Sequence, residues 1–138
     1  MTSPDQHTLA HHFIITAADC NSQREISIAH LVTLIIETAT EHANSIGVGF
    51  DRLISHGMSW VLSRLSIELD AVPSINRRYK LVTWVESINR LYSERNFEIV
   101  DVESGERLGY ARTIWMAIDM ESRRPADLSA LHILERYI

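Results

Sequence analysis

The clearest periodicity in the chain runs from Ser27 to Ile46, where apolar residues recur every three or four positions. Gly47 follows this run, at the place where a left-handed residue commonly ends a helix. The pattern therefore predicts one helix over 27–46, of about five turns. Its middle is apolar almost all round except at Thr33, which favours a helix covered on most of its sides over one lying on a surface.

The other regular segments alternate with a period of two, the spacing of β-strands. One strand is expected before the helix and about four long strands after it, with a hairpin turn over Glu103–Glu106 between the last two. A short closing helix is expected over Asp127–Ile138. The expected strands are His11–Ala18, Met58–Asp70, Tyr79–Asn89, Tyr92–Val102 and Leu108–Asp119.

This order of elements predicts an α+β protein, because strands that follow one another without intervening helices pair in antiparallel fashion. We expect an antiparallel sheet of about five strands wrapped around one long helix, which is the hot-dog fold. The 138 residues contain no linker or repeat and have the length of one ordinary domain, so residues 1–138 are expected to form a single hot-dog domain. A second copy would cover the sheet edge, which predicts a homodimer or a higher hot-dog assembly.

The composition limits the kinds of chemistry that the chain can support. A formal net charge of −5 disfavours non-specific binding to nucleic acid. The single cysteine, Cys20, excludes an intrachain disulfide and a thiolate zinc cluster. His11 and His12 are neighbours on an expected strand and point to opposite faces, so the two side chains cannot bind one metal ion together. Neither a metal nor another cofactor is expected. No apolar run is long enough for a membrane span, and the polar N-terminus lacks a secretory core, so a cytoplasmic location is expected.

Five blocks of sequence stand out, in this order along the chain: Glu37–Gly47, Ser59–Glu68, Val82–Glu86, Asp101–Gly109 and Ala111–Pro125. Together they resemble the acyl-acyl-carrier-protein thioesterase family, and the resemblance extends over nearly the whole chain. It implies a hot-dog fold. It also implies hydrolysis of the thioester between a fatty acyl chain and acyl carrier protein, a reaction of fatty acid biosynthesis.

The turn before the long helix departs from the family pattern. Members of the family carry two hot-dog domains in one chain, and this chain matches the first. The resemblance implies that the family's catalytic carboxylate, asparagine and histidine lie in the second domain, around the start of its long helix. In the equivalent turn here, Gln23 stands in the place of the asparagine and Glu25 in that of the histidine. Three interpretations stay open: half of an enzyme, a part of a longer chain, or a homodimer that uses a different carboxylate.

The candidate catalytic residues are Glu37, Glu25 and Asn21. A carboxylate in the apolar middle of a helix is costly unless it has a partner or a function, and desolvation would strengthen it as a general base, so Glu37 is the first choice. The alternative is a polar stripe formed with Thr33 and Glu41. Glu25 is a second candidate base, and Asn21 would orient water or polarise the carbonyl. The structural alternative for both is the shaping of a turn at the start of a helix.

The acyl chain would lie against apolar side chains of the helix and strands, although each of these residues has the alternative role of a core residue. Two basic clusters, over 77–80 and 123–124, are candidate docking points for an acidic carrier protein, with ordinary turn charge as the alternative. The candidate acyl-binding residues are Val32, Ile36, Trp60, Trp84 and Met116.

These observations support a homodimeric acyl-carrier-protein thioesterase. Water would attack the thioester carbonyl, with Glu37 or Glu25 as general base and an amide at the helix start as oxyanion donor. The alternative is a non-catalytic acyl- or carrier-protein-binding half-domain of an enzyme with two hot-dog domains. A hot-dog dehydratase, in which His30 would act beside the helix carboxylate, is a third possibility.

Overall fold

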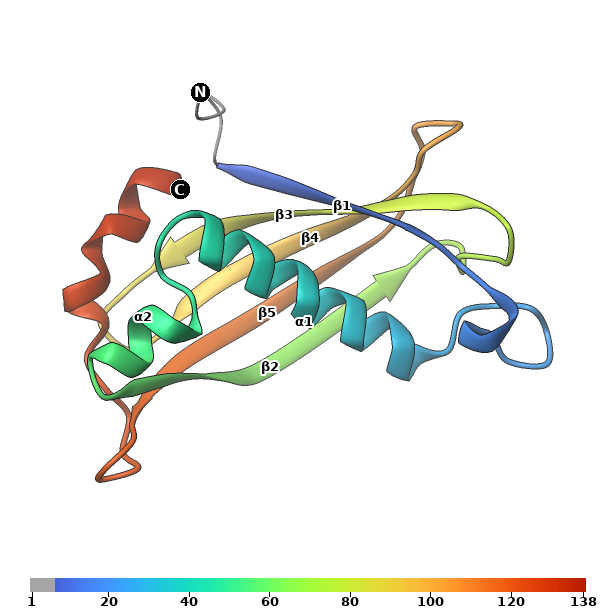
Figure 1. Ribbon diagram of the computed structural model, residues 1–138. Coiled ribbons are helices and arrows are strands. Elements are labelled where there is room, and N and C mark those ends of the chain that lie inside the picture. Colours follow the sequence, from blue (N-terminus) through green and yellow to red (C-terminus); the bar gives the residue numbers. More distant parts are fainter. Residues whose placement is uncertain (1–6) are drawn as a thin grey trace.

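Five antiparallel strands form one sheet in the computed structural model, which describes residues 7–138 apart from the side chains of residues 130, 132 and 133. The strands lie in the order β1-β3-β4-β5-β2, so β1 and β2 are the edges (Figure 1). This arrangement confirms the expected α+β class. The strands are β1 (Thr8–Ile14), β2 (Met58–Leu69), β3 (Arg78–Ile88), β4 (Ser93–Asp101) and β5 (Arg107–Asp119).

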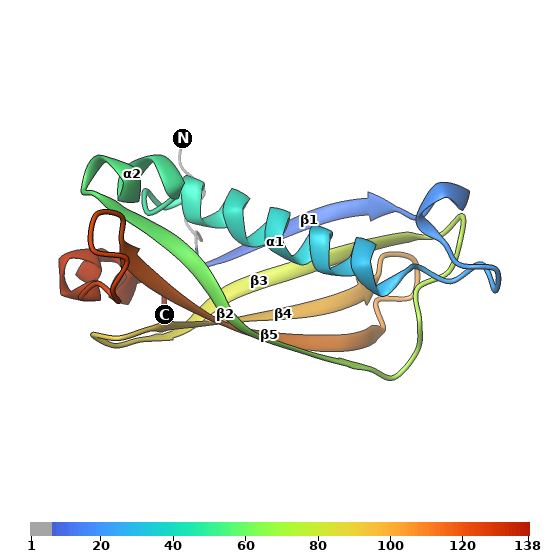
Figure 2. The ribbon, with the colours of Figure 1, turned by 90° about the horizontal axis from the view of Figure 1, so that it is seen from below.

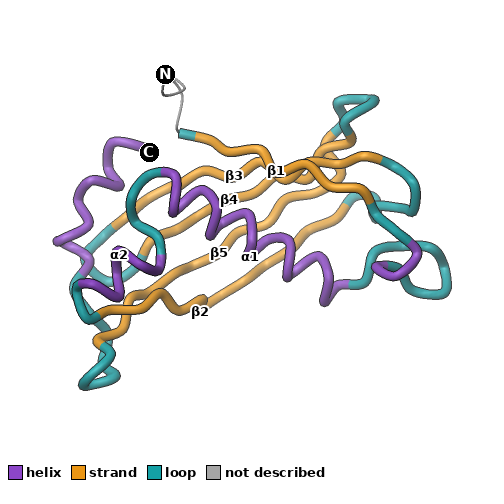
Figure 3. The backbone as a smooth tube through the Cα atoms, in the orientation of Figure 1, coloured by secondary structure: helices purple, strands orange, loops and turns teal. Residues whose placement is uncertain are grey.

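The long helix α1 (Ile28–Ser45) lies along one face of this sheet (Figures 2 and 3). Ser27 caps its N-terminus, because the Ser27 hydroxyl accepts a hydrogen bond from the backbone N–H of His30 (3.2 Å). After the helix, Gly47 has a φ of 81°, the left-handed conformation expected at this position. The prediction of a helix over 27–46 is therefore confirmed to within one residue at each end.

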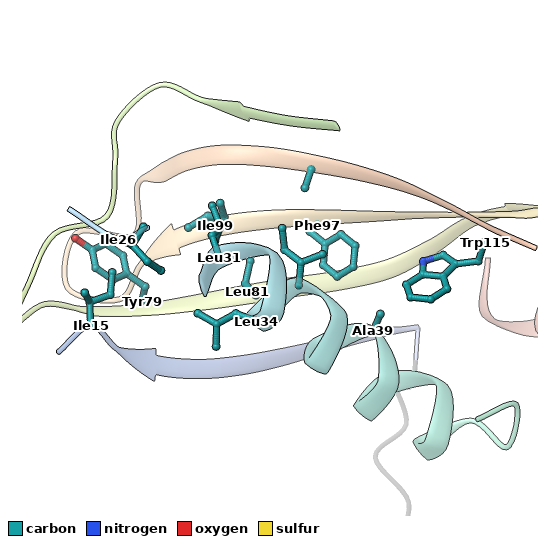
Figure 4. Close-up of a cluster of buried hydrophobic side chains, with 12 residues drawn as sticks. Ile15, Ile26, Leu31, Leu34, Ala39, Tyr79, Leu81, Phe97, Ile99 and Trp115 are labelled. Atoms are coloured by element: carbon teal, nitrogen blue, oxygen red, sulfur yellow. The ribbon is translucent and has the colours of Figure 1, made fainter. Parts of the chain in front are cut away.

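The main core lies between α1 and the sheet (Figure 4). Alternate residues of the central strands face the helix, as the period of two predicts: Leu81 of β3, Phe97 of β4 and Ala111 of β5 are all buried. Each fully buried Leu, Ile or Phe contributes about 1.5–3 kcal/mol to folding relative to an exposed one. From α1, the residues buried against this layer are Leu31, Leu34, Ile35, Thr38, Ala39 and His42.

A second, smaller cluster closes one end of the sheet. There the short helix α2 (Phe50–Ser55) and the 3₁₀ helix η2 (Leu128–Tyr137) lie at the same end of the molecule (Figure 1). Leu53 of α2 and Leu128 of η2 belong to one buried group of side chains. The closing helix expected over 127–138 is present as this η2, with non-helical backbone at Leu131.

Two local elements differ from the sequence prediction. The first strand was expected over His11–Ala18, but β1 ends at Ile14 and the chain forms a 3₁₀ turn, η1, over Ala17–Asp19. The side chain of Asp19 causes this, because its Oδ2 accepts hydrogen bonds from both the backbone N–H and the hydroxyl of Thr16. The helix α2 was not expected at all. Within the described part of the chain, no helix has both the length and the apolar character needed to cross a bilayer.

Candidate functional site

Glu37 lies halfway along α1, on the side that faces away from the sheet, where it is exposed. Thr33 and Glu41, one turn away on either side, are exposed as well. Glu41 Oε2 lies 3.0 Å from Nδ1 of His11 on β1. In a single chain, Glu37 thus belongs to a polar stripe, and its use as a desolvated base depends on a partner that covers this side of α1.

Glu25 and Asn21 lie in the loop that precedes α1. The Asn21 Oδ1 atom accepts hydrogen bonds from the backbone N–H groups of Gln23 (2.9 Å) and Glu25 (3.2 Å), so this side chain shapes the turn. Glu25 is half-buried and forms a backbone bridge with Ser74. Glu37 follows the first residue of α1 by nine positions, or about 14 Å along the helix axis. One chain therefore does not bring Glu37 together with Glu25 and Asn21.

A carboxylate–imidazole pair lies beside this loop. His30 Nε2, in the first turn of α1, is 3.4 Å from Asp19 Oδ1. Hydrogen bonds from the backbone and side chain of Thr16 hold the pKa of Asp19 below its ordinary value, and His30 lowers it further. The sequence pattern did not predict the pairing of His30 with Asp19, because the path of a loop cannot be read from periodicity. Among the described residues, no group of three His, Cys, Asp or Glu side chains is arranged to hold a metal ion.

A pocket opens between the C-terminal half of α1 and the sheet. The empty space between its walls is about 420 Å³ when the open solvent at its mouth is included, and the volume open to the centre of a water molecule is about 30 Å³. Thr40, Ser93 and Arg95 supply the polar part of its lining. Ala39 and Trp115 lie on opposite sides of this region, on α1 and on β5 (Figure 4). The apolar wall includes Ala39, Ala43, Val48, Phe50, Trp60 and Trp115.

The five candidate acyl-binding residues fall into two groups. Trp60 lines the pocket and is fixed there, because its Nε1 donates a hydrogen bond to the carbonyl of Val48 (2.8 Å). Val32 and Ile36 are half-buried and share one side of α1. Trp84 and Met116 alternate with buried neighbours on β3 and β5 and so lie on the other face of the sheet, away from α1. Trp60 therefore lies in the pocket wall, whereas Trp84 and Met116 lie on the face of the sheet that is turned away from α1.

Arg95 is a pocket residue that the sequence analysis did not identify. It is only 6% exposed, and its Nη1 donates hydrogen bonds to Nδ1 of His42 (2.6 Å) and to the hydroxyl of Thr83 (3.3 Å). Burial lowers the pKa of Arg95 to about 10, so the side chain remains a cation at neutral pH. The alternation of β4 carries the signal, because Ser93, Arg95 and Phe97 share the inward face.

Comparisons with known proteins agree with this fold. Residues 6–135 match the model of the acyl-ACP thioesterase N-terminal domain. The chain is 28% identical over 118 residues to the acyl-[acyl-carrier-protein] hydrolase FATB3 of Cuphea viscosissima, a match that covers 81% of this chain and 29% of that protein. The solved acyl-ACP thioesterase of Bacteroides thetaiotaomicron superposes with a TM-score of 0.84 at 32% identity, over 87% of this chain and 49% of that one.

A structure that the chain covers almost completely shows the same fold. The 1,4-dihydroxy-2-naphthoyl-CoA thioesterase of Synechocystis superposes with a TM-score of 0.80 at 18% identity, over 92% of this chain and 95% of that one. The hot-dog fold is thereby confirmed. The chain spans about half of the Bacteroides thioesterase and less than a third of the Cuphea protein. Since the family model matches nearly the whole chain, the chain belongs to the family of acyl-ACP thioesterase N-terminal domains.

Proposed function

We propose that the chain hydrolyses fatty acyl thioesters of acyl carrier protein and releases free fatty acids, as a thioesterase assembled from two hot-dog domains. The observation that carries this proposal is an apolar pocket between α1 and the sheet in a chain of this family. The apolar wall of this pocket suits an acyl chain, whose burial is favoured by about 0.8 kcal/mol per CH₂ group. The proposal includes a homodimer in the cytoplasm, and both of these remain predictions.

A pair of domains is needed for the chemistry as well as for the fold. In one chain, the exposed Glu37 is about 14 Å along the axis from the start of α1, where the first-turn N–H groups would serve an oxyanion. A base and an oxyanion donor that act on one carbonyl would therefore come from different copies. Covering the outer side of α1 would also remove Glu37 from water, which strengthens a carboxylate as a base.

The reaction would proceed through attack by water on the thioester carbonyl. Glu37 takes a proton from the water as its oxygen bonds to the carbonyl carbon, and an N–H group at the start of α1 stabilises the oxyanion. The carbon–sulfur bond then breaks, and the proton passes to the departing thiolate. Glu25 is the second candidate for the base, and Asn21 the candidate for orienting the water, although Asn21 Oδ1 already accepts two backbone hydrogen bonds in its loop.

The second candidate function is a non-catalytic half-domain that binds the acyl chain or the carrier protein. Two observations favour it: the chain spans 29% of its Cuphea relative, and Asn21 is engaged in holding its own turn. In this case the pocket would still bind acyl chains, but the base and oxyanion donor would belong to another domain.

Hydrolysis by the purified 138-residue chain separates the two functions. The wild type is compared with Glu37→Gln and Glu25→Gln on medium- and long-chain thioesters of acyl carrier protein and of coenzyme A. Glu41→Gln is the matched control, because Glu41 is exposed one turn further along the same side of α1. Loss of the true base should lower kcat by about 10²–10⁴-fold. Absence of turnover by the wild type on every substrate would contradict the thioesterase proposal and leave the binding half-domain.

A further inference from the structure

The pocket beside α1 combines an apolar wall with a buried cation. Trp60, Trp115 and Phe50 contribute large apolar surfaces to it, and Arg95 lies in its lining. An apolar chain would need the first feature but gains nothing from the second. Because burying a guanidinium is unfavourable unless other groups compensate for it, Arg95 needs an explanation of its own.

Among the residues that the structure describes, the side-chain hydrogen bonds of Arg95 all come from one of its nitrogen atoms. Nη1 donates to Nδ1 of His42 and to the hydroxyl of Thr83, both of which are uncharged acceptors in this geometry. Among the described residues, no hydrogen bond reaches Nε or Nη2, and no carboxylate lies within 4 Å of the guanidinium. The cation is thus held in place by neutral groups and has no counter-charge there.

The remaining N–H donors of Arg95 form the planar edge that suits a carboxylate. Nε and Nη2 can donate two parallel hydrogen bonds to its two oxygen atoms, an arrangement that a hydroxyl or a methyl group cannot match. Such a ligand would also supply the missing negative charge in a region where solvent screening is weak. Its apolar part would lie against the aromatic wall.

We propose that this pocket binds a carboxylate group carried on an apolar chain, with the carboxylate on the Nε and Nη2 edge of Arg95. Two kinds of molecule carry this chemistry: a free fatty acid, and an acyl group with a second carboxylate at its far end. The inference goes beyond thioester hydrolysis and does not rest on it, since binding to the isolated chain is the quantity to be measured.

Calorimetric titration of the 138-residue chain tests the proposal with small probes. Octanoate should bind about tenfold more tightly than octanamide, which has the same shape without the charge. Monomethyl suberate distinguishes a free fatty acid from an acyl group with a second carboxylate, because its ester imitates the reacting end of such an acyl group. Tighter binding of octanoate indicates a free fatty acid, and equal or tighter binding of the monoester indicates the far carboxylate. Equal affinity of the wild type for octanoate and octanamide would overturn the proposal.

Substitution assigns the charge preference to Arg95. The Arg95→Met chain should bind octanoate and octanamide with equal affinity. Arg78→Met removes an exposed arginine from β3 and should keep the preference for octanoate. A folded Arg95→Met chain that kept the preference would overturn the assignment.

A measurement on the wild type covers the case in which Arg95→Met does not fold. The Nε–H resonance of Arg95 should shift as octanoate is added to the ¹⁵N-labelled protein. If pocket resonances move while this one does not, the proposal is wrong.

Discussion

Buried polar side chains around the pocket are joined to the backbone and to one another. The Thr83 hydroxyl donates to the carbonyl of Asn96 (2.9 Å), and the Thr113 hydroxyl donates to the carbonyl of Arg95 (3.0 Å). Trp115 Nε1 donates to the Thr113 hydroxyl (2.8 Å). Because an unpaired buried polar group costs about 1–3 kcal/mol, these bonds disfavour other registers of β3, β4 and β5 at this level of the sheet. They also fix the strand that carries Arg95.

Asp101, at the end of β4, links stability to pH. Arg77 donates to its Oδ2 from Nε (3.1 Å) and Nη2 (2.6 Å), and the backbone N–H groups of Glu103 and Ser104 donate to its Oδ1. The Arg77 hydrogen bond is the largest of the causes that hold the pKa of Asp101 below its ordinary value. A carboxyl with a lowered pKa contributes stability that is fully present above its unfolded pKa, near 3.9, and is lost as the pH falls through the folded value.

We therefore expect Asp101→Asn to lower the free energy of unfolding at pH 7 and to make its fall below about pH 4 less steep. Urea unfolding between pH 7 and pH 3 measures both effects. Asp70→Asn, at the exposed position after β2, is the control and should follow the wild type. If the free energy of unfolding falls equally steeply below pH 4 in the wild type and in Asp101→Asn, this carboxyl does not cause the loss of stability in acid.

At the scale of elements, the N-terminus of α1 depends on one side chain. The Ser27 hydroxyl satisfies the N–H of His30, one of the backbone donors that a helix leaves without a partner at its start. Ser27→Ala should lower the free energy of unfolding by about 1 kcal/mol, as measured by urea titration. Ser27→Asp restores an acceptor at the same place and should recover most of the loss. If Ser27→Asp is as unstable as Ser27→Ala, the hydrogen bond is not the cause.

The pairing of β5 with the edge strand β2 requires a glycine at position 109. Gly109 pairs with Leu69, and a Cβ atom at this position would lie 2.6 Å from the carbonyl oxygen of Glu68 and 2.6 Å from Cδ2 of Leu69. Both are too close, and the carbonyl belongs to the backbone, so the strands would have to move apart. Gly109→Ala should cost about 1–3 kcal/mol of unfolding free energy in urea titrations. Ser66→Ala, exposed on β2, should cost far less, and equal losses would contradict the steric argument.

The long elements were predictable because each keeps one period over many residues. The helix over 27–46 and the four strands after it agree with α1, β2, β3, β4 and β5 to within one residue at each end. By contrast, α2 has only six residues, too few to show a helical period. The end of β1 was wrong because it is set by the hydrogen bonds of Asp19 to Thr16, which no hydrophobic pattern contains.

The candidate site was less predictable than the fold. Of the two candidate tryptophans, Trp60 lines the pocket, whereas the alternation of β3 puts Trp84 on the outer face of the sheet. Arg95 was missed because a pattern of apolar positions assigns a charged residue to the solvent. Its hydrogen bonds join residues of three elements, α1, β3 and β4, so only the assembled fold reveals them.

At the scale of the whole molecule, two surfaces of the single chain are uncovered: the sheet edge formed by β2 and the outer side of α1. β2 is an edge strand and carries Val61 with 39% of its surface exposed, while Leu62, Leu65 and Ile67 on the same strand are only half-buried. On α1, Ile28 is exposed at the start of the helix. Exposed apolar residues on an unpaired edge favour association with another strand. A second copy joined at β2 would extend the sheet and bring two α1 helices near each other.

Association through β2 predicts a dimer of twice the 15.8 kDa chain mass, which light scattering after gel filtration measures directly. Val61→Lys should weaken this dimer at least about tenfold, because charges on an edge strand oppose pairing and two copies would bring two of them together. Val72→Lys is the matched control, since Val72 is 38% exposed but lies beyond β2, and it should leave the dimer intact. A wild type that stays at the mass of one chain would contradict the dimer. Glu37 would then remain in water, where it has no reason to act as a strengthened base, and hydrolysis by a homodimer would fail with it.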